Sequence, residues 1–409
     1  MEYDLDALGW LQFERLCGHA LPVDRALWRG SADEARLATV GDGRTFVVVW
    51  VREPPPHLSV AELDRVRAVL DDTPDAVVVN NVQDRPPQLL GPAWLASVID
   101  GDPALRLRVP SVLGVRPAGD LDPVAHDLAR VFVPTRAYHR AVDVLERHAF
   151  AVLTGPPEMG KTAIARMVGL ARQSAGWEVH ECLRPDDVLE RHDAARDQVF
   201  IADDAFGSTE YRPDAAERWA RDLPRILRAT DERHWLIWTS RPAPLRAGLH
   251  RVHQERGAER FPSPAQVQVD ASALDTDEKA SILFRHAKAA DLGDHQRAWM
   301  RRHGERVVAH PHFTPERIRR LVADRELRGD PWQVLETQLT TPTEAMATSL
   351  AALEPEHRAL LTAMLDLPPG PVGERDLAAS LRRHHDGGLH HAPVDLIDRL
   401  ADHFLRVIA

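Results

Sequence analysis

The first part of the chain alternates an amphipathic segment with short apolar runs. An apolar face at helical spacing predicts a helix close to the start, carried by Phe13, Leu16, Cys17 and Ala20. Residues 45–51 form an almost continuous β-branched run, residues 60–70 have helical spacing, and residues 75–79 form a second apolar run. Because parallel strands are joined by a crossover helix, this order predicts a βαβ unit. We therefore expect a compact α/β domain over residues 1–118.

Five further apolar runs follow in the centre of the chain, separated by helical segments. They predict strands at residues 149–153, 177–182, 198–202, 235–239 and 266–269. After the first run, one helical face that can lie on a sheet is formed by Ile164, Met167, Val168 and Ala171. This alternation predicts a doubly wound parallel sheet with helices on both faces, over residues 122–275.

Strand signals almost vanish from residue 276 onward. The stretches DEKASILFRHAKAA and PERIRRLVAD have helical spacing, so residues 276–341 are expected to form a helical lid domain. Residues 342–409 contain short helical patterns and a turn rich in glycine and histidine, which is compatible with a winged-helix-like domain. The fold class is therefore α/β, with two α/β domains followed by two smaller helical ones.

The composition narrows the classes of protein. A formal charge of −11 argues against a protein that coats nucleic acid through bulk electrostatics, so any nucleic-acid contact must be local. Cys17 and Cys182 fit neither a disulfide framework nor a zinc-ligand spacing, which suits a reducing cytoplasm. No stretch approaches the roughly 20 apolar residues of a membrane span, and the start lacks a cationic and then apolar leader. We expect a cytoplasmic protein without a membrane partner.

The motif GPPEMGKT joins a predicted buried strand to the amphipathic helix. Gly155 and Gly160 allow successive backbone N–H groups to face one concavity, where the start of the helix adds its dipole. Lys161 would reach the β and γ phosphates, and the Thr162 hydroxyl would ligate magnesium. An ordinary loop is the alternative, but the flanking strand and helix favour a phosphate site. The predicted nucleotide-binding residues of this loop are Gly155, Pro156, Pro157, Glu158, Met159, Gly160, Lys161, Thr162 and Ala163.

Charged side chains follow two later strands at the edge where doubly wound sheets bind ligands. QVFIADDAFG ends a buried strand in Asp203, the predicted magnesium-side carboxylate. Next comes Asp204, the candidate for polarising the attacking water or sensing the γ-phosphate. The alternative is that both aspartates cap a helix. HWLIWTSRP places Arg241 on the same edge as a candidate γ-phosphate contact, with a solvated loop arginine as the alternative.

With these motifs the chain resembles the STAND NTPases, the signal-transducing ATPases related to NLR immune receptors, and in particular their third novel bacterial branch. The matching motifs run in consistent order over residues 132–322 and include FVPTRAYHRAVDVLERHAFAVLTGPPEMGKT, GWEVHECLRPDD, QVFIADDAFG, LIWTSRP and HPHFTPERIRRLV. The resemblance implies a hinge that flanks the adenine, formed by Phe132, Val133, Pro134 and Arg136. It further implies that Arg241 is the sensor arginine and that either His310 or Arg317 is a second sensor.

The end of the chain resembles the winged-helix segment that follows the lid in this family. Relatives usually continue into helical repeats that recognise a trigger. The sequence is therefore either a piece of a longer protein or a short form that senses through another surface. The cluster HHDGGLHH, from His384 to His391, has enough imidazoles for a metal site, but its glycines favour a solvated turn.

The N-terminal domain resembles an Mrr-like restriction-endonuclease fold. Active members need an acid or glutamine and then a lysine on the central strand, because these groups collect a metal ion and a nucleophilic water. This strand instead ends in Trp50, Val51 and Arg52, which cannot supply that chemistry. The nearby carboxylates are Asp33, Glu34 and Asp42. We therefore expect a degenerate nuclease that serves as a binding module.

Together these features predict a nucleotide-driven switch that takes ATP or ADP with Mg²⁺. ATP binding and slow hydrolysis would control the position of the lid and winged-helix domains, and so assembly into a homo-oligomer on activation. The resemblance implies a setting in bacterial signalling or antiphage defence, with a protein or a nucleic acid as the trigger. One alternative is an ATP-dependent DNA nuclease of the restriction type. Another is an inert scaffold in which bound GTP or ADP is structural and turnover is negligible.

Overall fold

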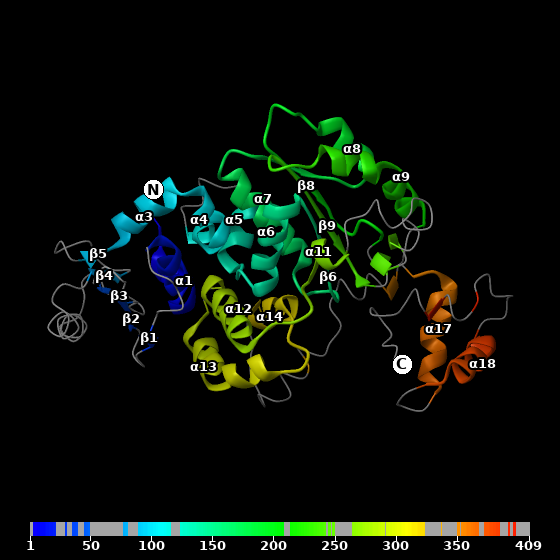
Figure 1. Ribbon diagram of the computed structural model, residues 1–409. Coiled ribbons are helices and arrows are strands. Elements are labelled where there is room, and N and C mark those ends of the chain that lie inside the picture. Colours follow the sequence, from blue (N-terminus) through cyan, green and yellow to red (C-terminus); the bar gives the residue numbers. More distant parts are fainter. Residues whose placement is uncertain are drawn as a thin grey trace.

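A computed structural model of the 409-residue chain contains two five-stranded sheets, with helices after the second sheet (Figure 1). The structure describes residues 3–21, 29–30, 35–39, 45–49, 77–80, 89–115, 123–207, 213–242, 264–290, 292–323, 353–367 and 372–384, with short pieces at 244–246, 248–249, 337, 350–351, 392 and 396–397.

The N-terminal sheet mixes antiparallel and parallel pairs. Its strands are β1 (Arg29–Gly30), β2 (Ala35–Thr39), β3 (Thr45–Val49), β4 (Val77–Asn80) and β5 (Leu89–Leu90), in that spatial order. β1, β2 and β3 pair antiparallel, whereas β3, β4 and β5 pair parallel. The two predicted apolar runs are therefore parallel neighbours, β3 and β4, as a βαβ unit requires. The predicted helix at 60–70 lies outside the described residues.

Short helices cover this sheet and connect it to the rest of the molecule. They are η1 (Leu5–Leu8), α1 (Trp10–Ala20), α3 (Pro92–Gly101), α4 (Pro103–Arg108) and η3 (Pro110–Val115). The apolar face of α1 is fully buried at Phe13, Leu16 and Cys17. η3 lies so close to α5 (Pro123–Val131) that a Cβ on Gly114 would be 2.1 Å from the carbonyl oxygen of Ala129. Only glycine permits this approach.

The central sheet is entirely parallel, as the sequence pattern predicts. Its order is β10-β6-β9-β8-β7, formed by β6 (Phe150–Thr154), β7 (Glu178–Glu181), β8 (Gln198–Ala202), β9 (His234–Ser240) and β10 (Gln268–Asp270). The accompanying helices are α6 (Arg136–His148), α7 (Lys161–Gln173), α8 (Pro185–Arg191), α9 (Pro213–Ala229) and α11 (Pro264–Val267). Because the strands are parallel, their carboxyl ends meet at one edge, where the site residues lie.

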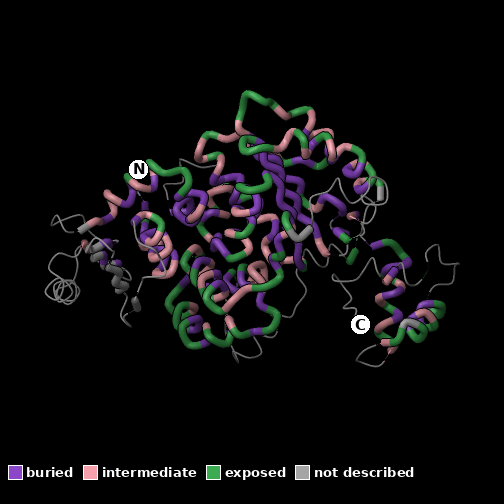
Figure 2. The backbone as a smooth tube through the Cα atoms, viewed as in Figure 1, coloured by how far each residue is buried: buried purple, intermediate pink, exposed green. Residues whose placement is uncertain are grey.

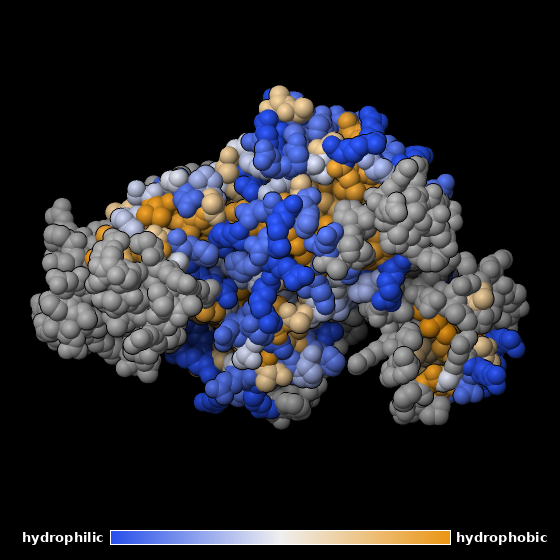
Figure 3. Space-filling model, viewed as in Figure 1, coloured by the Kyte–Doolittle hydropathy of each residue, from blue (hydrophilic) through white to orange (hydrophobic). Residues whose placement is uncertain are grey.

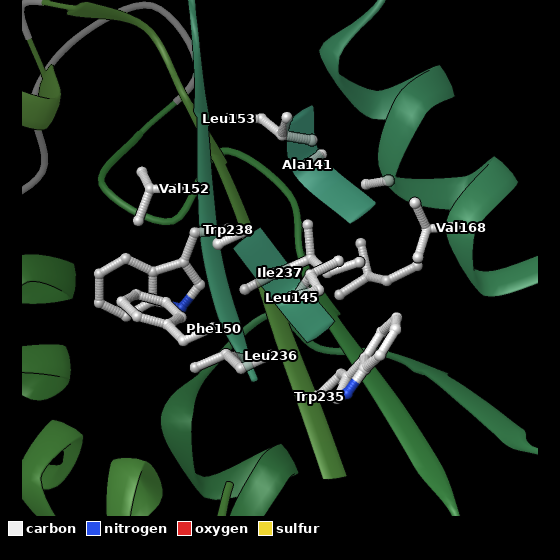
Figure 4. Close-up of a cluster of buried hydrophobic side chains, with 14 of the residues drawn as sticks. Ala141, Leu145, Phe150, Val152, Leu153, Val168, Trp235, Leu236, Ile237 and Trp238 are labelled. Carbon is white, nitrogen blue, oxygen red and sulfur yellow. The ribbon is translucent and has the colours of Figure 1, made fainter. Parts of the chain in front are cut away.

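The core of this domain uses both faces of its strands. Figure 4 shows Phe150, Val152 and Trp238 on one face of β6 and β9 and Leu145 and Ile237 on the other. The Trp238 ring meets Phe150 edge to face, with ring centroids 5.1 Å apart. All residues of β6, β8 and β9 are buried, and Figure 2 shows this buried layer through the middle of the molecule. Burial on both faces explains why these strands read as continuous apolar runs.

The central sheet is followed by α12 (Thr276–Ala289), α13 (Asp294–Ala309) and α14 (Pro315–Ala323). We call them the lid. A capping box fixes the start of α12, because Asp275 accepts from the Glu278 N–H while the Glu278 carboxylate accepts from the Asp275 N–H. The lid has its own apolar core, made by Ile282, Trp299, Val307, Ile318 and Leu321. Val133 belongs to the same cluster, so the lid packs directly on the predicted adenine hinge.

A pair of helices closes the described chain, α17 (Pro355–Leu365) and α18 (Glu374–His384). They pack on each other through Leu360, Leu377 and Leu381. The predicted winged-helix fold needs elements beyond these two helices, and most of the cluster from His384 to His391 lies outside the described residues. Both therefore stay predictions.

The described surface is largely hydrophilic over the central domain and lid (Figure 3). Within the described part of the chain, none of the helices combines the length and the apolar character needed to cross a membrane. Cys17 and Cys182 are both buried free thiols.

Candidate nucleotide site

The glycine-rich loop lies between β6 and α7. Gly155 has φ +148°, and its missing side chain leaves room for the backbone at Ser272, whose nitrogen would be 3.2 Å from an added Cβ. Gly160 has φ +85° and precedes α7 without a side-chain cap on the helix. Glu158, between them, also has a left-handed backbone with φ +68°. The first N–H groups of α7 are thus available to an anion, which is how phosphate-binding loops hold phosphate.

Lys161 is the first residue of α7 and is buried within the loop. Its ammonium donates to the carbonyl oxygens of Gly155, over 2.9 Å, and Pro156, over 2.8 Å. Burial lowers the pKa of Lys161 to about 8. The positive charge of Arg241 contributes to this lowering, and the negative charge of Asp204 opposes it. The charges of Asp204 and Arg241 therefore act on the Lys161 ammonium.

Asp203 joins two hydroxyls at the end of β8. Its Oδ1 accepts from Thr162 Oγ1 over 2.8 Å and from Thr239 Oγ1 over 2.5 Å. The Thr162 hydroxyl and the Asp203 carboxylate thus offer two neighbouring oxygen ligands, the kind that Mg²⁺ prefers. Mg²⁺ typically takes only one or two protein carboxylates and completes its coordination shell with phosphates and water. Thr162 and Asp203 therefore fit the magnesium role predicted for them.

Asp204 has an unusual backbone and an unusual charge environment. Its φ is +47°, which costs a non-glycine residue about 1–3 kcal/mol, and its N–H donates to Thr239 Oγ1 over 2.9 Å. Burial and the neighbouring Asp203 together raise the pKa of Asp204 to about 6, against the effects of Arg241 and Lys161. A raised carboxyl pKa beside a phosphate loop is typical of a group that handles protons.

Arg241 follows β9 at the same edge. Burial lowers the pKa of Arg241, whereas the charges of Asp204 and Glu158 raise it. The carboxylates that act on this guanidinium are thus Asp204, which follows β8, and Glu158 of the loop. Asp203, Asp204 and Arg241, the three side chains predicted to act in catalysis, all follow the carboxyl ends of the neighbouring parallel strands β8 and β9.

A cavity of 470 Å³ extends from this loop to the hinge and lid. Its loop end is lined by Gly160, Lys161 and Thr162, and its hinge end by Phe132 and Val133. The lid adds apolar and charged side chains that the sequence analysis did not single out, namely Ile282, His286, Glu316 and Arg319. A cationic loop at one end and an apolar wall at the other suit the phosphates and base of a nucleotide.

The remaining hinge residues face neighbouring elements rather than this cavity. The carbonyl oxygen of Pro134 accepts from Arg15 of α1 over 2.8 Å. The N–H of Arg136 donates to Glu278 over 2.5 Å, and its guanidinium lies 3.4 Å from Asp275. The hinge is therefore bonded both to the N-terminal domain and to the start of the lid.

The two candidate second sensors lie differently. Arg317 lines a neighbouring 450 Å³ cavity with Pro156 and Pro157, and its Nε is 3.4 Å from the Glu158 carboxylate. His310 is buried at the end of α13, where its Nδ1 accepts from the His312 N–H. Neither is among the residues that line the larger cavity, whereas Arg319 is.

The nuclease motif predicted for the N-terminal domain lies outside the described residues, at Trp50, Val51 and Arg52 and at the carboxylates Asp33, Glu34 and Asp42. Among the described residues there is no group of three or more His, Cys, Asp or Glu side chains arranged to hold a metal ion.

Comparison with known families supports the interpretation of the central domain. The model of the family described as “Novel STAND NTPase 3” matches residues 132–289, a segment that contains the hinge, the glycine-rich loop, Asp203, Arg241 and α12. This match supports a STAND-class P-loop NTPase over the segment, with the nucleotide binding and NTPase activity that the class implies. None of the curated proteins compared matches the chain.

Solved structures show only distant similarity. The chain resembles a Walker-type ATPase of Pyrococcus abyssi, with 12% identity and a TM-score of 0.39 over 65% of this chain and 95% of that one. It also resembles AMPPCP-bound DnaA from Aquifex aeolicus, with 13% identity and a TM-score of 0.31 over 69% and 89%. The Orc1 protein of Aeropyrum pernix in complex with DNA has 16% identity and a TM-score of 0.35 over 66% and 83%. These values are too low to transfer a binding property.

Proposed function

We propose that the protein is a STAND-type ATPase in which ATP binding and slow hydrolysis switch the position of the lid. The observation that carries the proposal is the 470 Å³ cavity, because the glycine-rich loop, the hinge and the lid all line it. A ligand that contacts two movable parts stabilises the arrangement in which both contacts are made. ATP and ADP differ at the γ-phosphate, beside which Lys161, Asp204 and Arg241 would lie.

Each polar residue has a distinct part in this proposal. Lys161 and the N–H groups of α7 hold the β and γ phosphates, while Thr162 and Asp203 hold Mg²⁺, which supplies charge neutralisation on the phosphate oxygens. Asp204 orients and polarises the attacking water. Arg241 stabilises negative charge that develops on the γ-phosphate.

The base would lie at the hinge end, against Phe132 and Val133. Ile282 from α12 covers the same end, so the base links the hinge to the lid. Arg319 of α14 lines the cavity with Glu316, its ion-pair partner at 2.6 Å, and gives the lid a charged group toward the ligand. We assign the base as adenine because the hinge resembles that of the STAND ATPases.

The switch would control self-association and display of the N-terminal domain, in a bacterial defence or signalling setting. The motif loss at Trp50 and Arg52 favours a domain that binds rather than cuts. The trigger would be a protein or a nucleic acid that changes lid position.

Calorimetric titration of the purified chain with ATP, ADP and GTP, each with and without Mg²⁺, tests the site. The proposal expects saturable binding of ATP and ADP, tighter with Mg²⁺, and weaker binding of GTP. A control titration with Arg228→Ala, an exposed residue of α9 away from the cavity, should match the unmodified chain. No binding of any nucleotide would refute the proposed function.

A further inference from the structure

A second polar cavity, of 270 Å³, lies where three parts of the chain meet. Asp4 and Ala7 line it from the N-terminal domain, Arg130 from α5, and Arg285 and Lys288 from α12 of the lid. α12 contacts both η1 and α5 in this region. The cavity is separate from the nucleotide site, and none of the roles assigned above uses it.

Arg285 is the central group of this cavity. Its side chain is 2% exposed, and its two terminal nitrogens donate to backbone carbonyls of different parts, Ala7 over 2.7 Å and Ala129 over 2.9 Å. Its Nε is buried without a hydrogen-bond partner among the described residues. A buried guanidinium that meets only backbone carbonyls keeps its full charge uncompensated, which is costly unless an anion is near.

The surrounding side chains add further positive charge to the cavity. The side chains that line the cavity carry three permanent cations, Arg130, Arg285 and Lys288, and one carboxylate, Asp4. Burial and the like charge of Arg130 together lower the pKa of Arg285 to about 10, against the opposing effect of Asp4. Lys288 is paired with Asp6 outside the cavity lining, at 3.1 Å.

His126 of α5 adds a polar ring nitrogen. It lines the same cavity, and its Nδ1 is buried without a hydrogen-bond partner in the described part of the chain. Two guanidinium groups, an ammonium and an imidazole around one small space suit a multiply charged oxyanion better than a single carboxylate. The volume lies below the roughly 300–1,000 Å³ of pockets for drug-sized ligands, so the ligand is small.

We propose that this cavity binds a small phosphate-type anion, either inorganic phosphate or the phosphoryl group of a small monoester, between Arg130, Arg285 and Lys288. Since Arg285 also holds the carbonyl of Ala7, the bound anion fastens the N-terminal domain to the lid. The site would therefore oppose any movement that separates the two. This proposal does not depend on the nucleotide function.

Inorganic phosphate is the probe for the test. The full chain is saturated with ADP and Mg²⁺, so that the glycine-rich loop is filled, and phosphate is titrated calorimetrically at constant ionic strength. A parallel titration of Lys161→Ala without nucleotide removes the loop as a phosphate site and keeps the test valid even where ADP does not bind. We expect saturable phosphate binding in both samples. Repeating the titration with phenyl phosphate distinguishes the two sources, since equal or tighter binding assigns the site to a monoester.

Arg130→Gln is the decisive variant, because Arg130 is exposed and its side chain donates only a long, exposed hydrogen bond of 3.5 Å to the carbonyl of Ala289, so we expect the fold to tolerate the change. Removal of one charge-assisted contact should weaken phosphate binding by about tenfold or more. Arg301→Gln, at an exposed position of α13 outside the cavity, is the matched control and should bind as the unmodified chain does.

Hydrogen exchange gives a second measurement. Phosphate at the concentration that half-saturates the unmodified chain should slow amide exchange at residues 5–8 in that chain and slow it much less in Arg130→Gln. The proposal is overturned if phosphate does not bind the unmodified chain, or if Arg130→Gln and Arg301→Gln bind it with equal affinity. It is also overturned if exchange at residues 5–8 does not respond to phosphate.

Discussion

Thr162 Oγ1 donates to Asp203 Oδ1 over 2.8 Å, which joins the start of α7 to the end of β8. The two residues are 41 positions apart in sequence, and the parallel order of β6, β9 and β8 brings them together. Thr239 of the intervening strand β9 donates to the same Asp203 oxygen. Hydroxyls from two elements thus fix one carboxylate oxygen before any ligand binds, which is the preorganisation that a metal–phosphate site needs.

Lys161→Ala should weaken nucleotide binding. The ammonium is held inside the loop by two carbonyls, so its charge is already positioned for the phosphates. A charge-assisted contact contributes about 1.5–3 kcal/mol, so affinity for ATP should fall about 10- to 100-fold. Calorimetry measures this change, with Arg228→Ala as the control. Unchanged affinity in Lys161→Ala would contradict the assignment of the phosphate site.

Asp204→Asn should separate binding from turnover. The amide keeps the shape of the side chain and removes the carboxylate that would polarise water, so ATP should still bind while hydrolysis falls by about 100-fold or more. Phosphate release measures turnover, and calorimetry on the same sample measures affinity. Should binding and turnover fall together, Asp204 has a role in holding the nucleotide instead.

The pH dependence of kcat/KM should have two limbs. Asp204, with a pKa of about 6, must be ionised to polarise water, so the rate should fall as the pH drops through about 6. Lys161, with a pKa of about 8, must be charged to hold phosphate, so the rate should also fall as the pH rises through about 8. Steady-state assays from pH 5 to 9 check both limbs. In Asp204→Asn the acid limb should disappear, and its persistence would assign that limb to another group.

Gly114→Ala should loosen the contact between the N-terminal domain and the central domain. The new Cβ would lie 2.1 Å from the backbone oxygen of Ala129, which a packed interface cannot accept without shifting, at a cost of about 1–3 kcal/mol or more. Scanning calorimetry should show a lower unfolding temperature. Gly101→Ala is the matched control, since nothing lies within 4 Å of its Cβ position and its temperature should not fall. Equal unfolding temperatures in both variants would contradict the close approach.

The central sheet was predictable because its strands are buried on both faces and read as apolar runs. β8 occupies the predicted residues, and β6 and β9 differ from the prediction by one residue at their ends. β10 begins two residues later than predicted because α11 takes up residues to Val267. β1 and β2 could not be predicted, because Arg29–Gly30 and Ala35–Thr39 mix polar and apolar side chains without a clear period.

The candidate site was predictable where a motif fixes both spacing and neighbours, as in the loop and the strand end at Asp203. The lid residues were not. Arg317 and Arg319 lie on one short helix, and side chains two positions apart point to different faces. Which of them faces the larger cavity depends on the rotation of α14, which Ile318 and Leu321 fix by packing in the lid core. That packing joins residues far apart in the chain, so it leaves no local pattern in the sequence.

The central claim is that nucleotide controls assembly through the lid, and one measurement tests it most directly. Light scattering gives the mass of the purified chain with ADP, with ATP and with a non-hydrolysable ATP analogue, for the unmodified chain and for Asp204→Asn. We expect the ADP sample to have the lowest mass, the analogue to increase it, and Asp204→Asn with ATP to match the analogue because hydrolysis is blocked. The same mass in every sample, with nucleotide binding verified by calorimetry, would contradict the switch.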